Sequence, residues 1–136
     1  MKIIVKKDYL DLSKEASKLI ELEIKNNSKL VLGLATGSTP LGTYKELIKK
    51  HKENGLDFSK ITTFNLDEYL GIDHNHPNSY HYFMEENLFK HINVKSENIH
   101  LLSGETDNPE KECEEYEKLI NAAGGIDLQV LGVGPN

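Results

Sequence analysis

The sequence is poor in the residues that build disulfides, cysteine metal clusters and guanidinium clamps. Of its 136 residues only one, Cys113, is a cysteine, and none is arginine or tryptophan. A single cysteine excludes a disulfide within the chain and a cysteine-based metal cluster. Without arginine, an oxyanion held by these residues must be bound by backbone amides, hydroxyl groups or lysine.

Long apolar runs and basic blocks are also missing. No apolar stretch approaches the roughly 18–20 residues that cross a bilayer, and the stretch 1–7 has too few apolar residues between its lysines for a signal peptide. The formal net charge of −6 argues against nucleic acid as a partner, because that binding depends on neutralising phosphates. We therefore expect a cytoplasmic protein that binds neither nucleic acid nor a membrane.

The chain has the size and composition of one ordinary domain, since domains span roughly 100–200 residues. Its residues are 38% hydrophobic and 28% charged. Apolar runs typical of strands alternate with helical patterns, which predicts βαβ units and a parallel sheet. The first helix should be capped by Asp8 and bury a face with Leu12, Ala16, Leu19 and Ile20. We expect a single α/β domain over residues 1–136, with strands at 2–5, 30–34, 61–66, 98–102 and 126–133, and helices at 8–25, 41–52, 79–91 and 109–123.

A run of small residues, Ala35-Thr36-Gly37-Ser38-Thr39-Pro40, lies between an expected buried strand and an expected helix. Small residues let backbone N–H groups approach a ligand, and the amino end of a helix favours an anion. Thr39 could cap the helix, with Pro40 in its first position. The run is neither a Walker A loop nor the dinucleotide fingerprint, because the lysine and the glycine spacing are wrong. A phosphate-binding loop and an ordinary βα turn with a good cap both remain open.

A pair of acidic residues follows the next expected strand, in Thr62-Thr63-Phe64-Asn65-Leu66-Asp67-Glu68-Tyr69. Asp67 and Glu68 should lie at the carboxyl end of that strand, near the cleft that the glycine loop borders. A carboxylate there can act as a general base on a substrate C–H or O–H. A solvated pair of loop residues is the alternative, and the occurrence of both motifs at strand ends favours the functional interpretation.

Three histidines, His74, His76 and His81, lie within eight residues. Asp73 is the one carboxylate close to them in sequence, and no second cluster has the spacing of metal ligands. We therefore expect no metal and no other cofactor. Ser79 is better explained as the cap of the following helix, and Cys113 as a packing residue.

These segments resemble the glucosamine-6-phosphate deaminase family. The resemblance implies a Rossmann-like, doubly wound α/β fold with helices on both faces of a mostly parallel sheet. It also implies the conversion of glucosamine 6-phosphate and water to fructose 6-phosphate and ammonia, without a metal; a homo-oligomer is compatible with it. The matching stretches, in chain order, are Leu32-Gly33-Leu34-Ala35-Thr36-Gly37-Ser38-Thr39-Pro40-Leu41-Gly42-Thr43-Tyr44, Thr63-Phe64-Asn65-Leu66-Asp67-Glu68-Tyr69, His76-Pro77-Asn78-Ser79-Tyr80, Gly124-Gly125-Ile126-Asp127 and Gly132-Val133-Gly134-Pro135-Asn136.

The resemblance assigns roles to individual residues. Asp67 matches the carboxylate that removes the C2 proton, and Asn136 matches a member of the ring-opening group. The substrate-binding residues are expected to be Thr36, Gly37, Ser38, Thr39, Glu68 and Gly134. The family continues beyond this motif with the ring-opening histidine and its supporting glutamate, so we expect these residues to form an amino-terminal half that is inactive alone.

Two alternatives remain at this point. The first is 6-phosphogluconolactonase, whose acidic motif usually reads Asp-Glu-Arg and then Val-Pro, where this chain has Asp67-Glu68-Tyr69-Leu70-Gly71. The second is a phosphosugar-sensing domain of a transcription regulator, which would bind without turnover. Such a regulator would also carry a basic helix pair for DNA, and none is visible in the sequence.

Overall fold

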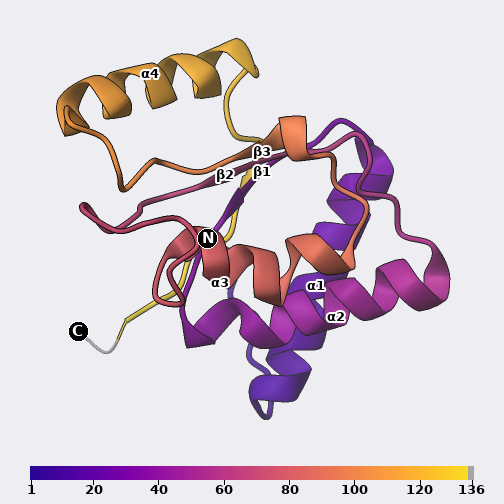
Figure 1. Ribbon diagram of the computed structural model, residues 1–136. Helices are drawn as coiled ribbons and strands as arrows, with labels where there is room; N and C mark the ends of the chain where they lie inside the picture. The colour runs from indigo at the N-terminus through magenta and orange to yellow at the C-terminus, as the bar shows by residue number, and fades with distance from the viewer. Residues whose placement is uncertain (135–136) are drawn as a thin grey trace.

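The computed structural model describes residues 1–134 as an α/β fold in which strands and helices alternate (Figure 1). Both the parallel sheet and the alternation that the sequence predicts are confirmed. No helix in this part of the chain is both long and apolar enough to span a bilayer. The elements are α1 (Tyr9–Asn26), β1 (Val31–Leu34), α2 (Ser38–Asn54), β2 (Thr62–Asn65), α3 (Tyr80–Asn87), 3₁₀ turns at Phe89–His91 and Ser96–Asn98, β3 (Ile99–His100), α4 (Pro109–Ala122) and β4 (Leu128–Gln129).

The four strands form one parallel sheet in the order β3-β2-β1-β4. β1 therefore lies inside the sheet, where its complete burial explains why its sequence is a continuous apolar run. The register runs from Val31 opposite Thr62 to Leu34 opposite Asn65. Because the two strands end level with each other, the loops that follow them leave the sheet side by side.

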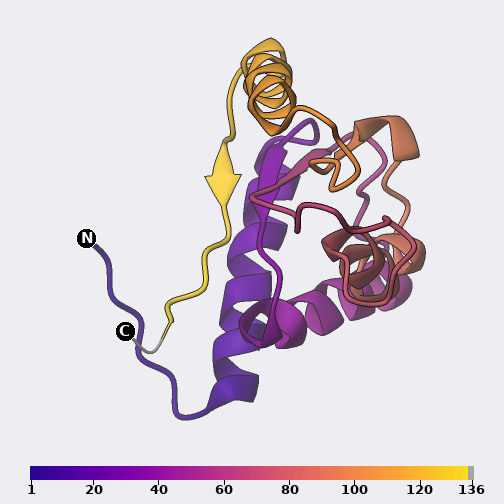
Figure 2. The same ribbon diagram turned by 60° about the vertical axis from the view of Figure 1, so that its left-hand side comes forward.

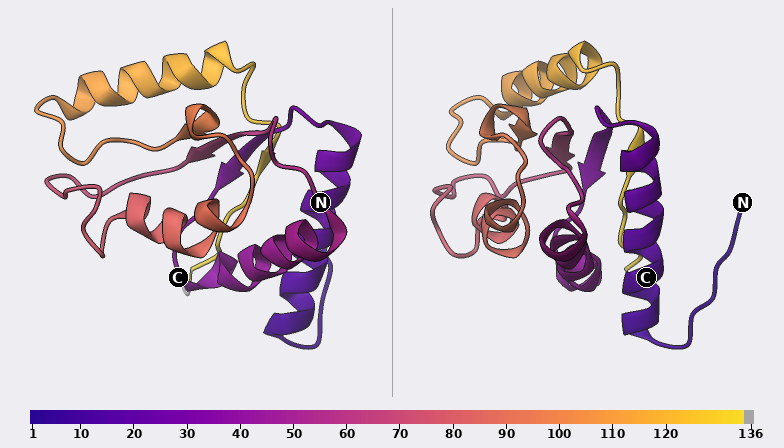
Figure 3. Two further views of the ribbon diagram at one scale, coloured as in Figure 1. Left: turned by 45° about the vertical axis from the view of Figure 1, so that its right-hand side comes forward. Right: turned by 90° about the vertical axis from the view of Figure 1, so that its right-hand side faces the viewer.

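Helices cover both faces of the sheet, with α4 on one face and α1, α2 and α3 on the other (Figures 1 and 3). Successive side chains of a strand point to opposite faces of the sheet. Val31 and Phe64 pack against Tyr116 of α4, whereas Leu32 and Leu34 belong to the larger core formed with the other three helices. The larger cluster contains Ile20, Ile24, Leu30, Leu32, Leu34, Tyr44, Leu47, Leu56, Phe58, Ile61, Met84, Leu88 and Phe89.

The buried face of α1 differs from the one expected. Asp8 does cap the helix, accepting a hydrogen bond from the Asp11 N–H at 2.8 Å. Of the expected face, Ile20 is buried and Ala16 partly buried, whereas Leu12 and Leu19 are exposed. The other buried positions are Ser13, Ser17 and Ile24. The reason is a close approach to α2, where a Cβ added to Gly42 would lie 2.2 Å from the Ser13 Oγ. Small residues are needed at that crossing, and a hydrophobic pattern does not reveal it.

Two further expectations are wrong. Residues 2–5 do not form a strand; they belong to an amino-terminal segment that leaves the body of the molecule (Figure 2), with Ile3 73% and Val5 86% exposed. A β-prone run becomes a strand only when a partner strand is available. In addition, α2 begins at Ser38 with Gly37 as its cap residue, so Thr39 is not the cap. The other expected strands and helices are present, but β3, β4 and α3 are shorter than predicted.

Candidate active site

The carboxyl ends of β1 and β2 bring the two sequence motifs to the same edge of the sheet. Asn65 Nδ2 donates to the Leu34 carbonyl at 3.3 Å, which links the ends of the two strands. From α4, the Tyr116 hydroxyl donates to the Asn65 carbonyl at 2.8 Å. Ligands of open α/β sheets bind at this edge, so the residues that follow Leu34 and Asn65 form the candidate site.

The loop after β1 is held in place by two tyrosines. The Tyr44 hydroxyl is fully buried; it accepts a hydrogen bond from the Ala35 N–H at 3.1 Å and donates one to the Ala35 carbonyl. Burial raises the pKa of Tyr44, so the phenol keeps the proton that it donates. The Tyr9 hydroxyl accepts from the Gly42 N–H at 2.8 Å and donates to the Ser38 carbonyl at 2.8 Å. The two tyrosines thus fix the backbone just after β1 and at the start of α2.

The outer side of the loop is suited to an anion. Gly37 has a φ of 92°, which a residue with a side chain rarely adopts. No side chain caps α2, so the N–H groups of its first turn have no side-chain acceptor. Gly37, Ser38 and Thr39 are exposed, and Thr36 is partly buried beside them. Backbone N–H groups, hydroxyls and the positive end of the helix dipole can therefore meet a phosphate here.

The segment after β4 passes beside the same loop. A Cβ added to Gly132 would lie 3.6 Å from the Thr39 Cβ. Gly134, two residues further on, is exposed. Asn136, the expected member of the ring-opening group, lies outside the described residues.

Asp67 and Glu68 have opposite environments although they are neighbours. Asp67 is exposed beyond the end of β2, where a ligand can reach its carboxylate. The Glu68 side chain is only 2% exposed and accepts hydrogen bonds from the backbone N–H groups of Tyr69, Tyr80 and His81 at 2.9–3.1 Å. Burial alone would raise the pKa of Glu68, but these hydrogen bonds outweigh it and the pKa is lowered. The carboxylate is therefore charged at neutral pH.

Tyr80, to which the sequence analysis gives no role, reaches the candidate site from α3. Its ring lies against that of Tyr69, with centroids 4.9 Å apart. The pKa of the Tyr80 phenol is raised, first by its hydrogen bond with Tyr69 and also by the nearby charge of Asp67, while a hydrogen bond with Thr36 opposes the rise. Both Thr36 and Asp67 thus affect the pKa of the phenol. Its position next to the cap residue Ser79 could be predicted, whereas its closeness to Thr36 could not.

Of the three neighbouring histidines, His74 belongs to a group of possible metal ligands. Asp73, His74 and Glu105 place one ligand atom each within 4.8 Å of one another, and all three residues are exposed. The His74 Nδ1 lies 3.0 Å from the Glu105 Oε2, which raises the pKa of His74. Sequence spacing could not reveal this group, because Glu105 is far from the histidines in the chain.

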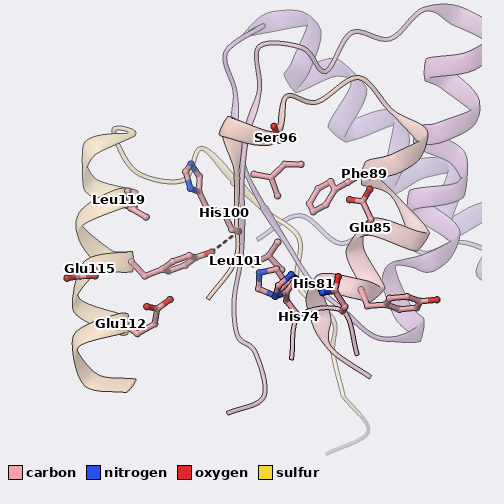
Figure 4. Close-up of a pocket in the computed structure, with 14 residues that line it drawn as sticks. His74, His81, Glu85, Phe89, Ser96, His100, Leu101, Glu112, Glu115 and Leu119 are labelled. Atoms are coloured by element: carbon pink, nitrogen blue, oxygen red, sulfur yellow. Dashed lines mark hydrogen bonds between the residues drawn. The ribbon is translucent and has the colours of Figure 1, made fainter. Parts of the chain in front are cut away.

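The cavity shown in Figure 4, of about 500 Å³, lies between α3 and α4 beside β3. Histidines and glutamates line it, among them His74, His81 and Glu85. Neither Asp67 nor the loop 36–39 contributes to its wall, so it is separate from the candidate site. His81 belongs to both regions, because its Nδ1 is 2.9 Å from the Glu68 Oε2.

A helix amino end and an exposed carboxylate at adjoining strand ends of a parallel sheet are typical of the α/β class of proteins that bind small ligands at this edge. The chain belongs to the family of glucosamine-6-phosphate isomerases/6-phosphogluconolactonase, whose model matches residues 9–136. This match agrees with the resemblance seen in the sequence motifs.

The relatives are close and are similar over the whole of this chain. It is 53% identical over 136 residues to a glucosamine-6-phosphate deaminase of Thermoanaerobacter sp. (strain X514), covering 54% of that protein, and 52% identical to one of Clostridium acetobutylicum, covering 56%. The chain thus spans about half the length of the curated relatives it matches. Among solved structures, a monomeric glucosamine-6-phosphate deaminase has a TM-score of 0.96 at 43% identity, with 98% of this chain and 56% of that one covered. A 6-phosphogluconolactonase from Thermotoga maritima has a TM-score of 0.78 at 27% identity, with 98% and 59% covered.

Proposed function

We propose that this chain takes part in the deamination of glucosamine 6-phosphate to fructose 6-phosphate and ammonia. The proposal is carried by one observation: the exposed Asp67 carboxylate and the loop 36–39, which is suited to an anion, lie at the same edge of the sheet. Support also comes from the relatives, which are named deaminases and match this chain from end to end.

Apart from Glu68, each expected residue of the site has a direct task in this reaction. The loop residues Thr36 to Thr39 bind the phosphate through backbone N–H groups and hydroxyls. Asp67 removes the proton at C2 and returns it at C1, which converts the open-chain amino aldose into a sugar with an imine at C2; water then adds to C2 and ammonia leaves, which gives the ketose. Gly134 lets the chain pass close to the substrate, and Asn136 orients a ring-opening group.

The proposal also covers the setting of the reaction. The net charge of −6 and the phosphosugar substrate favour a cytoplasmic enzyme that has no nucleic-acid partner. We retain a homo-oligomer as a prediction, which sedimentation of the active protein tests.

The test uses a chimera in which residues 1–136 replace the aligned part of the Thermoanaerobacter relative. We expect this full-length chimera to release ammonia from glucosamine 6-phosphate and to leave 6-phosphogluconolactone intact. The intact relative is the positive control. Lactone hydrolysis without ammonia release, or phosphosugar binding without turnover by a chimera that melts as cooperatively as the relative, would contradict the proposal.

A further inference from the structure

The Glu68 carboxylate joins the end of β2 to the beginning of α3. Its Oε1 accepts from the Tyr69 N–H at 2.9 Å and from the Tyr80 N–H at 3.0 Å. Its Oε2 accepts from the His81 N–H at 3.1 Å and lies 2.9 Å from the His81 Nδ1. Two of these donors are the first N–H groups of a helix, which have no acceptor within the helix itself.

The remaining N–H group of the first turn is satisfied separately. Ser79 Oγ accepts from the Tyr82 N–H at 3.0 Å and donates to the His74 carbonyl at 2.6 Å. Ser79 and Glu68 therefore divide the capping of α3 between them. Ser79 is local to the helix, whereas Glu68 comes from 12 residues earlier, next to Asp67.

This arrangement leaves Glu68 little capacity for a substrate. An ionised carboxylate offers about four acceptor sites, and the donors from Tyr69, Tyr80 and His81 use them. The side chain is also 2% exposed, in contrast with the exposed Asp67 beside it. A ligand at the strand ends can meet Asp67 without meeting Glu68.

The consequence of the link lies at Tyr80. As the first residue of α3, Tyr80 receives its position from the hydrogen bonds of its N–H to Glu68. Its ring then packs on Tyr69, whose N–H also donates to Glu68. The Glu68 carboxylate thus binds the backbone N–H groups of both tyrosines, Tyr69 and Tyr80.

We propose that Glu68 is a positioning residue, which fixes the backbone beside Asp67 and the start of α3 with the Tyr80 ring, and which does not itself contact the substrate. His81 is its partner and completes the set of donors. This inference rests on the proposed function for its kinetic readout. Its structural readout is independent of it.

The first experiment replaces Glu68 by Gln in the full-length chimera, with Glu85→Gln on the exposed side of α3 as the matched control. The amide of Gln presents an N–H₂ group to donors that need an acceptor. We expect kcat to fall at least roughly 10-fold with KM within about 3-fold, because alignment is lost and substrate contacts remain. Hydrogen exchange at the Tyr80 and His81 amides should accelerate. Glu85→Gln should change neither.

A second pair of variants covers the case in which Glu68→Gln does not fold. His81→Asn keeps a donor near the Nδ1 position, and His81→Leu removes it. We expect His81→Asn to retain most of kcat and His81→Leu to lose several-fold, with KM unchanged in both.

A rise in KM alone for Glu68→Gln would mean direct substrate contact and would overturn the inference. Equal kcat values for the two His81 variants, or unchanged amide exchange in Glu68→Gln, would also overturn it. If the chimera released no ammonia, the proposed function would fail, and the exchange experiment would still decide whether Glu68 holds α3.

Discussion

Replacing Tyr44 by Phe should loosen the loop that follows β1. The ring is fully buried, so Phe keeps its shape and removes only the hydroxyl group. That hydroxyl bonds both to the N–H and to the carbonyl of Ala35, and Ala35 is 8% exposed. Water therefore cannot readily take its place. The substitution leaves two backbone groups without their partner at the point where the candidate phosphate loop begins.

The cost can be estimated from these two groups. An unsatisfied buried donor or acceptor costs about 1–3 kcal/mol, so two that partly relax should lower the free energy of unfolding by about 2–4 kcal/mol. The KM for glucosamine 6-phosphate should also rise, because the N–H groups after Ala35 lose their fixed direction. Urea unfolding and steady-state kinetics of the chimera measure the two effects.

The matched control is Tyr82→Phe, which removes a hydroxyl from a residue that is 39% exposed. Surface changes of this kind usually stay within about 0.5 kcal/mol. If Tyr44→Phe were as stable as this control and bound substrate as well, the idea that Tyr44 holds the loop would be refuted.

Four further predictions concern the site and the chain as a whole. Asp67→Asn should lower kcat by roughly 10²–10⁴ with little change in KM; a parallel loss of binding would make Asp67 a binding group. Ser38→Asp should raise KM strongly, since two unit charges about 4 Å apart repel by about 4 kcal/mol at an effective dielectric of 20; an unchanged KM would place the phosphate elsewhere. The lowered pKa of Glu68 means that its stabilisation is complete above its unfolded pKa of about 4.3 and is lost as the pH falls through its folded pKa. In acid unfolding curves, wild type and Glu68→Gln should therefore converge at low pH, and a constant gap would argue against this linkage. Residues 1–136 expressed alone should self-associate in light scattering and release no ammonia, because Leu12, Leu19 and Leu22 are exposed on α1 and β4 has an open edge; an active monomer would contradict this.

Local signals predicted most of the elements. Asp8 caps α1 as expected because an Asx cap depends only on the next few residues. The apolar run at 30–34 indicated a strand buried on both faces, and β1 is such a strand. The strand-end argument also placed the loop 36–39 and Asp67 at one edge, because parallel strands in adjacent positions end on the same side.

One failure comes from the backbone conformation of a single glycine, and the others from the presence or absence of neighbours that are distant in sequence. Gly37 adopts a positive φ and displaces Thr39 from the cap position. Residues 2–5 have the pattern of a strand but no partner among the described residues. At the site, Asp67 and Glu68 look equivalent in sequence, and only the position of α3 separates an exposed carboxylate from a buried one.

The central position of β1 also has a consequence for how the protein is made. β1 needs a neighbour on each side, and on the β4 side the Val31 N–H donates to the Asp127 Oδ2 across 96 residues of chain. At roughly 5–20 residues per second, a ribosome takes about 5–20 s to deliver that neighbour. During this interval β2 can already pair with β1, but the opposite edge of β1 has no strand to meet. The length of that vulnerable period is set by the speed of translation and not by the stability of the finished sheet.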